Sequence, residues 1–582
     1  MPRTIVTALL VAGPMVTGAA GCADPVDSPL AELGSDGLML IGAPICPGSP
    51  YTTIQAAINA ATSGGTVTVC DGTFFERLTI SAKNLTLVSQ NGSALTTVDA
   101  AGLAPALTIT NGSVVTVEGF TFANGVTSGT GGNVSCSSST LVLSDNRLVS
   151  GSAGAGGGLG VTACSGSSSG NTFEANHAWD GGGAWIDSDA FPVSGNTFVA
   201  NTVDNRGGGA FLAGTLLFSN NTVESNFAVL YGGGVFRDFA DGDVTGNTFL
   251  LNTSDDDGAG LYINEGLGIV SDNTFELNDA GDDGGGLRMK LSGAMVLDNT
   301  FLSNHADNIG GGAKISHMDT TITGNTFTDN DSYVAAGALM LEECASYVAF
   351  NTYTDNDSED GGAVGIENGW DPVEIEDSTF LRNEASDTGG HIWVSLPLGP
   401  ETRIKRVTMV GGVANQGGSI YAIDSIVQID NVSMRLGTAW TSGGAMYLSG
   451  TSGSITNSVA WANDSAGGSG IRISNGAIGL DIVNTVFGGG TGGGAALHLS
   501  SGLEPTVRYS DFFKNGGINY TGMLDQTGLN GNLAVNPGFR NAKKGNFRLA
   551  VGSALLDAGD ASILDTDGTR SDIGRWGGPD AF

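Results

Sequence analysis

The stretch from Gly170 to Leu212 reads GNTFEANHAWDGGGAWIDSDAFPVSGNTFVANTVDNRGGGAFL and contains one sequence unit followed by its successor. Asn171-Thr172-Phe173 recurs as Asn196-Thr197-Phe198, and Gly181-Gly182-Gly183 recurs as Gly207-Gly208-Gly209. Self-similarity at a fixed period of this size is typical of a solenoid. We therefore expect an array of repeats.

One large apolar residue in each unit measures the period. Sixteen such positions follow one another at a nearly even spacing, the length of one unit. A domain built of unrelated elements does not hold register over so many steps, so the repeat extends along most of the chain. The positions are Phe122, Leu148, Phe173, Phe198, Val223, Phe249, Phe275, Phe301, Phe327, Tyr353, Phe380, Met409, Met434, Ala460, Val486 and Phe512.

The content of the unit indicates strands and tight turns. Each unit has only short apolar runs, such as Ala184-Trp185-Ile186, bounded by Gly, Asn and Asp, and helical repeats tolerate glycine badly. We predict an all-β, single-stranded right-handed parallel β-helix of about 16 coils, the number of positions in the apolar column, with coils stacked about 4.8 Å apart. The Asn three residues after the column, from Asn176 to Asn383, should stack as an amide ladder. Glycine triplets should supply positive φ or close packing between coils.

Composition limits the partners. The 582 residues carry Asp+Glu 59 against Lys+Arg 23, a net charge of -36 and a pI of about 4.1. Such a chain repels phosphate backbones, so we expect no nucleic-acid partner.

The first residues predict export. Residues 1–22 contain Arg3, an apolar run too short to span a bilayer, and then small residues, which indicates a signal peptide. Ala19-Ala20-Gly21-Cys22 resembles a bacterial lipobox, although Ala19 stands where Leu is usual, and the resemblance implies lipidation of Cys22. The chain is then an outer-membrane or cell-surface lipoprotein that touches membrane only through its anchor; plain secretion is the alternative. Residues 23–48 are predicted to be a tether.

Both ends of the solenoid need covers. An amphipathic helix is expected at residues 52–61, with Thr52 and Gln55 as a capping box, and it should close the first coil. With the following TVTVCDGTFFERLTI it resembles the opening of pectate-lyase-like β-helix proteins. We assign residues 49–515 to the β-helix and its N-terminal cap. Residues 516–582 resemble the tails of exported β-helix surface proteins and are assigned as the C-terminal cap.

Six cysteines lie in a chain predicted to be exported, where disulfides can form. Cys46 and Cys70 flank the predicted helix, and Cys136 and Cys164 lie about one coil apart, so both pairs are expected to bridge. Cys344 is left over.

The repeat resembles the polymorphic outer membrane protein repeat over residues 120–515. Phe-x-x-Asn, as in Phe173 to Asn176, alternates with Gly-Gly-Ala, as in Gly182 to Ala184. The resemblance implies a surface adhesin, although members of that family carry a C-terminal barrel that this sequence lacks.

Acidic turns precede the glycine triplets on successive coils. Stacked carboxylates suit calcium, which takes several oxygen ligands, and a solvated acidic turn is the alternative interpretation. The candidate ligands are Asp256, Asp257, Asp282, Asp283 and Asp307.

A second column follows the triplets, with one residue in each successive unit: Trp185, Phe211, Phe236, Tyr262, Arg288 and Lys314. If it faces outward, its four aromatic residues form a ladder on which sugars could stack, and the two cations favour that facing because buried unpaired cations are costly. An inward core stack is the alternative.

These features favour an interaction module, an adhesin or glycan binder, with a surface glycan or protein as ligand and a monomeric state. The alternative function is a calcium-dependent polysaccharide lyase or glycoside hydrolase on the same scaffold, in which Arg288 or Lys314 acts as the base beside the acidic turns.

Overall fold

The computed structural model describes residues 45–369, 372–396, 399–475 and 479–581. The predicted signal peptide, Cys22 and the tether up to residue 44 lie outside the described residues, as do residues 397–398 in the longest coil step. The chain divides into Met1–Ala43 and Pro44–Phe582, and all described residues belong to the second unit.

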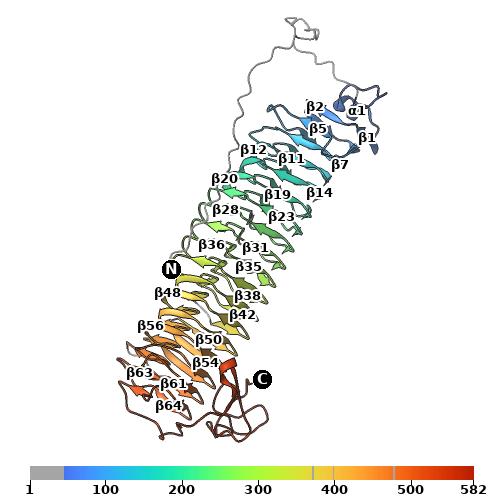
Figure 1. The fold of residues 1–582 in the computed structure, drawn as a ribbon. Helices are drawn as coiled ribbons and strands as arrows, with labels where there is room; N and C mark the ends of the chain where they lie inside the picture. Colours follow the sequence, from blue (N-terminus) through green and yellow to red (C-terminus); the bar gives the residue numbers. More distant parts are fainter. Residues whose placement is uncertain (1–44, 370–371, 397–398, 476–478, 582) are drawn as a thin grey trace, which may run out of the picture. The chain divides into compact units, whose positions relative to one another are not determined.

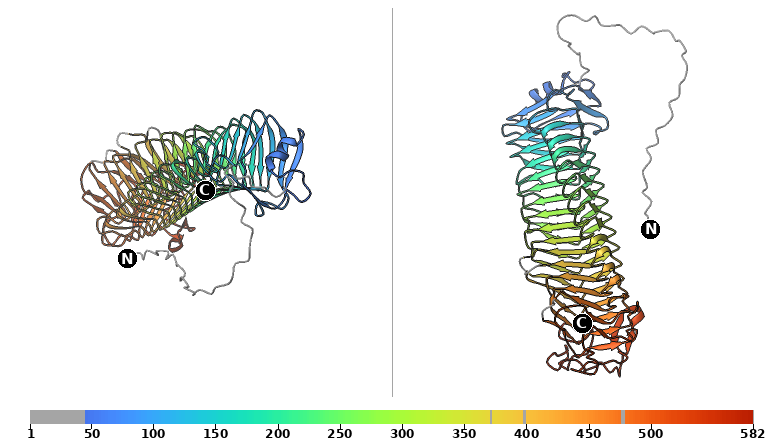
Figure 2. Two further views of the ribbon diagram at one scale, coloured as in Figure 1. Left: turned by 90° about the horizontal axis from the view of Figure 1, so that it is seen from above. Right: turned by 90° about the vertical axis from the view of Figure 1, so that its left-hand side faces the viewer.

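Each full coil contributes four short strands, as in β14 (Ser165–Ser169), β15 (Thr172–Glu174), β16 (His177–Asp180) and β17 (Ala184–Asp187). Each strand pairs in parallel with the equivalent strand of the next coil (Figures 1 and 2). The result is a right-handed parallel β-helix of about 17 turns with one short N-terminal helix, which confirms the predicted fold.

The stacked strands form four parallel sheets, which we name A to D. Sheets A, B and C contain eighteen strands each, and sheet D contains twelve. Sheet A runs from β1 (Gly65–Val69) to β64 (Thr506–Arg508), and sheet B from β2 (Gly72–Phe74) to β65 (Asp511–Phe513). Sheet C runs from β3 (Leu78–Ser81) to β66 (Tyr520–Thr521), and sheet D from β12 (Ser152–Ala155) to β56 (Thr438–Ser442).

The predicted apolar column lies on sheet B and fills the interior. Phe275 and Phe301 stack with centroids 4.8 Å apart and an interplanar angle of 6°. The column was placed wrongly at one position, because Ala460 pairs with Phe487 and not with Val486. Phe487 stacks on Phe512. The sequence spacing from Ala460 to Phe487 is therefore longer than predicted, and the spacing from Phe487 to Phe512 is correspondingly shorter.

The predicted amide ladder is present where the chain turns from sheet B to sheet D. Asn252 donates from Nδ2 to Oδ1 of Asn278 at 3.0 Å, and Asn278 donates in turn to Asn304 at 2.9 Å. A second ladder, which sequence analysis missed, lies between sheets A and B and includes Asn247 and Asn273. The sequence feature that could have predicted this second ladder is the Asn of the recurring Asn-Thr-Phe motif.

The glycine triplets form the corner between sheets D and C for both predicted reasons. Gly181 opens one triplet at φ 65°, in the left-handed region. A Cβ on Gly182 would lie 2.4 Å from the carbonyl oxygen of Gly208 in the next coil, so the coils can stack here only without a side chain.

Helix α1 (Ile54–Ala60) covers the first coil, with Ile54, Ala57 and Ile58 buried in the core. The expected capping box is not used: Thr53, not Thr52, is the N-cap, and it accepts from the amide of Ala56. The carboxylate of Glu76 accepts from the amides of Ile54 and Gln55, which satisfies donors that the helix itself leaves open.

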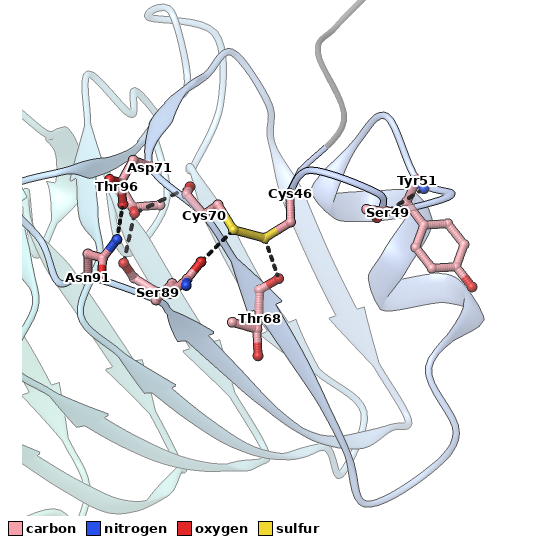
Figure 3. Close-up of a disulfide and its surroundings, with 10 residues drawn as sticks. Cys46, Ser49, Tyr51, Thr68, Cys70, Asp71, Ser89, Asn91 and Thr96 are labelled. Atoms are coloured by element: carbon pink, nitrogen blue, oxygen red, sulfur yellow. Dashed lines mark hydrogen bonds between the residues drawn. A yellow bond between two sulfur atoms is a disulfide. The ribbon is translucent and has the colours of Figure 1, made fainter.

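Two disulfides join the predicted cysteine pairs. Cys46–Cys70 ties the segment before α1 to the end of β1 (Figure 3). Cys136–Cys164 joins neighbouring coils beside sheets C and A. Cys344 is a buried free cysteine.

The C-terminal segment packs along the outside of sheet B. After the hairpin of β67 (Phe539–Asn541) and β68 (Asn546–Leu549), Leu555 and Ile573 pack on Val459 and Val486. Arg575 donates to the hydroxyl groups of Thr408 and Ser433. This segment therefore covers several of the last coils from the side, which explains why Val486 points outward and is still buried.

The amide ladder makes Asn278 a sensitive position. We expect Asn278→Ala to lower the free energy of unfolding by about 3 kcal/mol or more, because it leaves the main-chain and side-chain amides of Asn252 and the carbonyl of Phe249 without their partner. Denaturant unfolding would measure the loss. Asn91→Ala, at an exposed position, is the control and should change little. Equal effects of the two variants would show that the ladder does not stabilise the fold.

Candidate functional site

The six residues of the second sequence column lie in register on sheet C. They come from β17, β21 (Ala210–Ala213), β25 (Val235–Asp238), β29 (Leu261–Asn264), β33 (Leu287–Lys290) and β37 (Ala313–Ser316). Phe211, Phe236 and Tyr262 form a cluster apart from the main core, so the column points away from the interior. We call it the outer C column.

The aromatic residues of the outer C column are nevertheless covered. Phe211, Phe236 and Tyr262 are 6%, 2% and 4% exposed, and Trp185 alone is half-buried. The residue before each glycine triplet lies over them: Tyr231 is 5.0 Å from Tyr262, and the guanidinium of Arg206 is 4.9 Å from the rings of Phe211 and Phe236. The expected flat, exposed ladder for sugars is therefore not formed.

The same arrangement neutralises the two cations of the column. Asp257 and Asp283, each the residue before a triplet, lie against the cation of the next coil. Asp257 Oδ2 is 3.5 Å from Arg288 Nε, and Asp283 Oδ2 is 2.7 Å from Lys314 Nζ. Glu342 also contacts Lys314, at 3.0 Å. From Tyr231 to Asp283 each covering residue matches the residue of the next coil, aromatic on aromatic and acid on cation, whereas Arg206 is a cation that lies over two aromatic rings.

Burial governs the chemistry of these groups. Arg288 and Lys314 are 4% and 5% exposed. Burial, opposed by the nearby Arg288, raises the pKa of Asp257 to about 6, and it also raises the pKa of Tyr262. A base that abstracts a proton from a polymer must reach it. The structure places neither predicted base where a polymer could touch it, which weighs against the catalytic role considered for Arg288 and Lys314.

The five candidate calcium ligands divide among three places. Asp256, Asp257 and Asp282 each offer a carboxylate oxygen within 4.8 Å of the others, and this group could hold a calcium ion whose remaining ligands are waters. Burial and the charges of Asp282 and Asp283 raise the pKa of Asp256, as expected for crowded carboxylates. Asp283 instead binds Lys314, and Asp307 lies on sheet D.

Sheet D presents an open outward surface, which sequence analysis did not single out. The outward residues of its strands from β16 to β56 form two columns, and we name this surface the D face. Trp179, Tyr333 and Trp440 are 57%, 64% and 58% exposed on it. At the first residue of each of these strands and at the position two residues later there is no Lys or Arg, whereas eight of these residues are acidic: Asp204, Asp255, Asp279, Asp307, Asp331, Asp357, Glu359 and Glu384.

Acids stack directly on one another in the D face. Asp331 of β40 (Asp331–Ser332) pairs with Asp357 of β44 (Asp357–Asp360), which pairs with Glu384 of β48 (Glu384–Thr388). Like charges opposite each other on neighbouring strands destabilise a sheet. The D face is therefore strongly negative.

His305 of β36 (His305–Ala306) carries a positive charge on this surface. Its Nδ1 lies 2.7 Å from Asp331 Oδ2 and its Nε2 3.2 Å from Asp307 Oδ1. The hydrogen bond with Asp331, more than any other cause, raises the pKa of His305 to about 9, so the imidazole is protonated at neutral pH. The acids of the D face thus stabilise the positive charge of His305.

His391 lies at the corner between sheets D and C, inside the fold. It is fully buried, where other coils carry the third glycine of a triplet. Asn383 Nδ2 lies 3.1 Å from its Nδ1, and burial lowers the pKa of His391 to about 3, so the ring is neutral. His391 contacts the amide ladder at Asn383, and in the next coil Gly412 occupies the position of the Asn.

Comparisons with known proteins add little. No protein-family model and no curated protein matches the chain. It is similar to a PL6 alginate lyase solved in complex with a trisaccharide, at 11% identity over 91% of this chain and 92% of that one, with a TM-score of 0.27. It is also similar to a mannuronic acid specific family 6 lyase from human gut microbiota, at 10% identity over 84% and 90%, with a TM-score of 0.17. These values are too low to indicate an activity.

In the described part of the chain, no helix has the length and apolarity needed to cross a bilayer.

The buried ion pair between Lys314 and Asp283 allows a test of whether Lys314 has a structural or a catalytic role. We expect Lys314→Met to lower the free energy of unfolding by about 3 kcal/mol or more, because Asp283 would keep a buried charge, and Glu342 a partly buried one, without Lys314 as partner. Denaturant unfolding would measure this change. Lys290→Met removes an exposed lysine from the neighbouring strand of the same sheet and should be nearly neutral. Unchanged stability in Lys314→Met would mean that the lysine is held for another purpose.

Proposed function

We propose that the chain is an exported bacterial surface protein that acts as an interaction module, and that its D face binds a glycan or protein partner through cationic amino groups. The observation that carries the proposal is the stacked column Asp331, Asp357 and Glu384, in which like charges lie opposite each other over successive coils. An arriving cation would relieve the repulsion between them, and a net charge of -36 would steer such a partner from a distance.

Three further features support this function. The exposed rings of Trp179, Tyr333 and Trp440 offer apolar and cation–π contact beside the acids. The resemblance to polymorphic outer membrane protein repeats suits a surface adhesin, and the repeat residues have structural places: Phe in the core column, Asn in the ladder and Gly-Gly-Ala at the corner. Export and the anchor at Cys22 rest on the sequence of residues 1–22 alone.

The test is retention on a cationic glycan, chitosan, in low salt. We expect Glu359→Gln with Glu384→Gln to reduce the bound fraction severalfold, because both charges belong to the D face. Glu224→Gln with Glu276→Gln is the matched control, since it removes the same two charges from the outer surface of sheet B. Equal loss in both double variants would mean that net charge alone causes retention, and the D face would then have no special role.

A polysaccharide lyase remains the second candidate, because Asp256, Asp257 and Asp282 form a possible calcium group close to Arg288. Such an enzyme would need calcium to neutralise an acidic sugar and a base to take its proton.

We expect no unsaturated chain ends when the mature protein is incubated with alginate or pectate and calcium, because Arg288 is buried and paired. Absorbance of the unsaturated product would follow the reaction. New ends that disappear on chelation and in Asp256→Asn with Asp282→Asn would replace the binding function with the lyase. Ends that persist in that double variant would point to a contaminating enzyme.

A further inference from the structure

A hollow of about 340 Å³ lies on the outside of sheet A, away from both surfaces described above. Strands β38 (Thr320–Thr323), β42 (Ser346–Ala349) and β46 (Val373–Glu376) form its floor. Its lining consists of Asp319, Thr320, Thr321, Ala345, Ser346, Tyr347, Pro372 and Glu374. The volume is at the lower end of the range of roughly 300 to 1,000 Å³ found for small-molecule sites, so it suits one small unit of a ligand.

The corners between sheets C and A change length beside the hollow. Three residues connect Ser316 to Thr320 and three connect Glu342 to Ser346, whereas the two following corners, from Glu367 to Val373 and from Ser395 to Glu401, contain five residues each. Pro372, in the first of the longer corners, lines the hollow.

An aromatic side chain forms the centre of the floor. Thr321, Tyr347 and Glu374 are in register on adjacent strands and point outward. Tyr347 is 38% exposed, and its hydroxyl group lies 3.5 Å from Glu376 Oε2. The side chain is therefore partly open to solvent, with its polar end near Glu376. A negative ring face of this kind packs well against the C–H groups of a pyranose.

Hydrogen-bonding groups stand on two sides of that ring. Asp319 accepts from the amide of Ala345 through Oδ1 at 2.8 Å, which holds the carboxylate at the rim. On the opposite side, Glu374 Oε1 accepts from Arg403 at 2.7 Å. Carboxylates that are held in place in this way bind hydroxyl and amino groups strongly.

The charges around the hollow decide which sugars fit. Glu374, Glu376, Asp377 and Glu401 share the cations Arg403, Lys405 and Arg406. Asp319 adds a carboxylate for which no cationic partner is found in the described residues. The local balance is negative, so a sugar that carries a carboxylate of its own is repelled.

We infer that this hollow binds a pyranose unit that carries hydroxyl or amino groups and no carboxylate, with Tyr347 as the stacking platform and Asp319 and Glu374 as acceptors. A uronate polymer is excluded by the same charges. The inference is independent of the D face, since the two surfaces belong to different sheets and share no residue.

The experiment is calorimetric titration of the mature protein with cellotetraose, tetra-N-acetylchitotetraose and tetramannuronate. We expect at least one of the two uncharged tetrasaccharides to bind and tetramannuronate not to bind. Tyr347→Ala should weaken binding at least about tenfold, whereas Tyr347→Phe, which keeps the ring, should stay within about threefold. Tyr333→Ala removes an exposed tyrosine of the D face and is the matched control, expected to bind as the unchanged protein does.

Three outcomes would overturn the inference: no binding of either uncharged tetrasaccharide at millimolar concentration, undiminished binding by Tyr347→Ala, or binding of tetramannuronate at equal strength. Because Glu359→Gln with Glu384→Gln leaves the hollow intact, that double variant should bind the tetrasaccharide normally even where it loses chitosan. Failure of one site can thus be told from failure of the other.

Discussion

In-register hydrogen bonding between coils is the constraint on which the structure depends. Each backbone group finds its partner one coil away, so a residue always lies beside the same position of the next coil. A side chain in such a column must be compatible with copies of itself. Asn meets that condition because its amide is donor and acceptor at once, and Phe meets it because parallel rings stack well. Glycine meets it where no Cβ can fit.

Charged residues cannot satisfy this condition by repetition, and the chain treats them in two ways. At three successive coils of the outer C column the covering residue changes together with the residue that it covers. Tyr231 lies on Tyr262, Asp257 on Arg288 and Asp283 on Lys314. The buried cations Arg288 and Lys314 each have an acidic partner. Arg288 and Lys314, which look catalytic in the sequence, instead form ion pairs on the outside of sheet C.

The repeat period made the fold, the core column, one amide ladder and the Cys136–Cys164 pair predictable, because each follows from register, whereas Cys46–Cys70 was predicted from its position on either side of the N-terminal helix. The direction in which the outer C column points and the residues that cover it did not follow from the period. The outer C column points outward as its cations suggested, yet whether Phe236 meets solvent depends on how Tyr231 turns over it at a corner governed by Gly232 at φ 67°. The longer step that brings Phe487 into the core column was hidden because Val486 is also apolar.

The D face differs from the outer C column in how its acids are arranged. Asp283 is matched by Lys314, whereas Asp331, which contacts His305, is stacked on Asp357 and then on Glu384. His305 demonstrates the consequence, since these acids keep its imidazole protonated. Stability alone would favour a mixture of charges on such a surface. A column of like charges beside exposed aromatic rings is what the proposed binding of a positive partner would use.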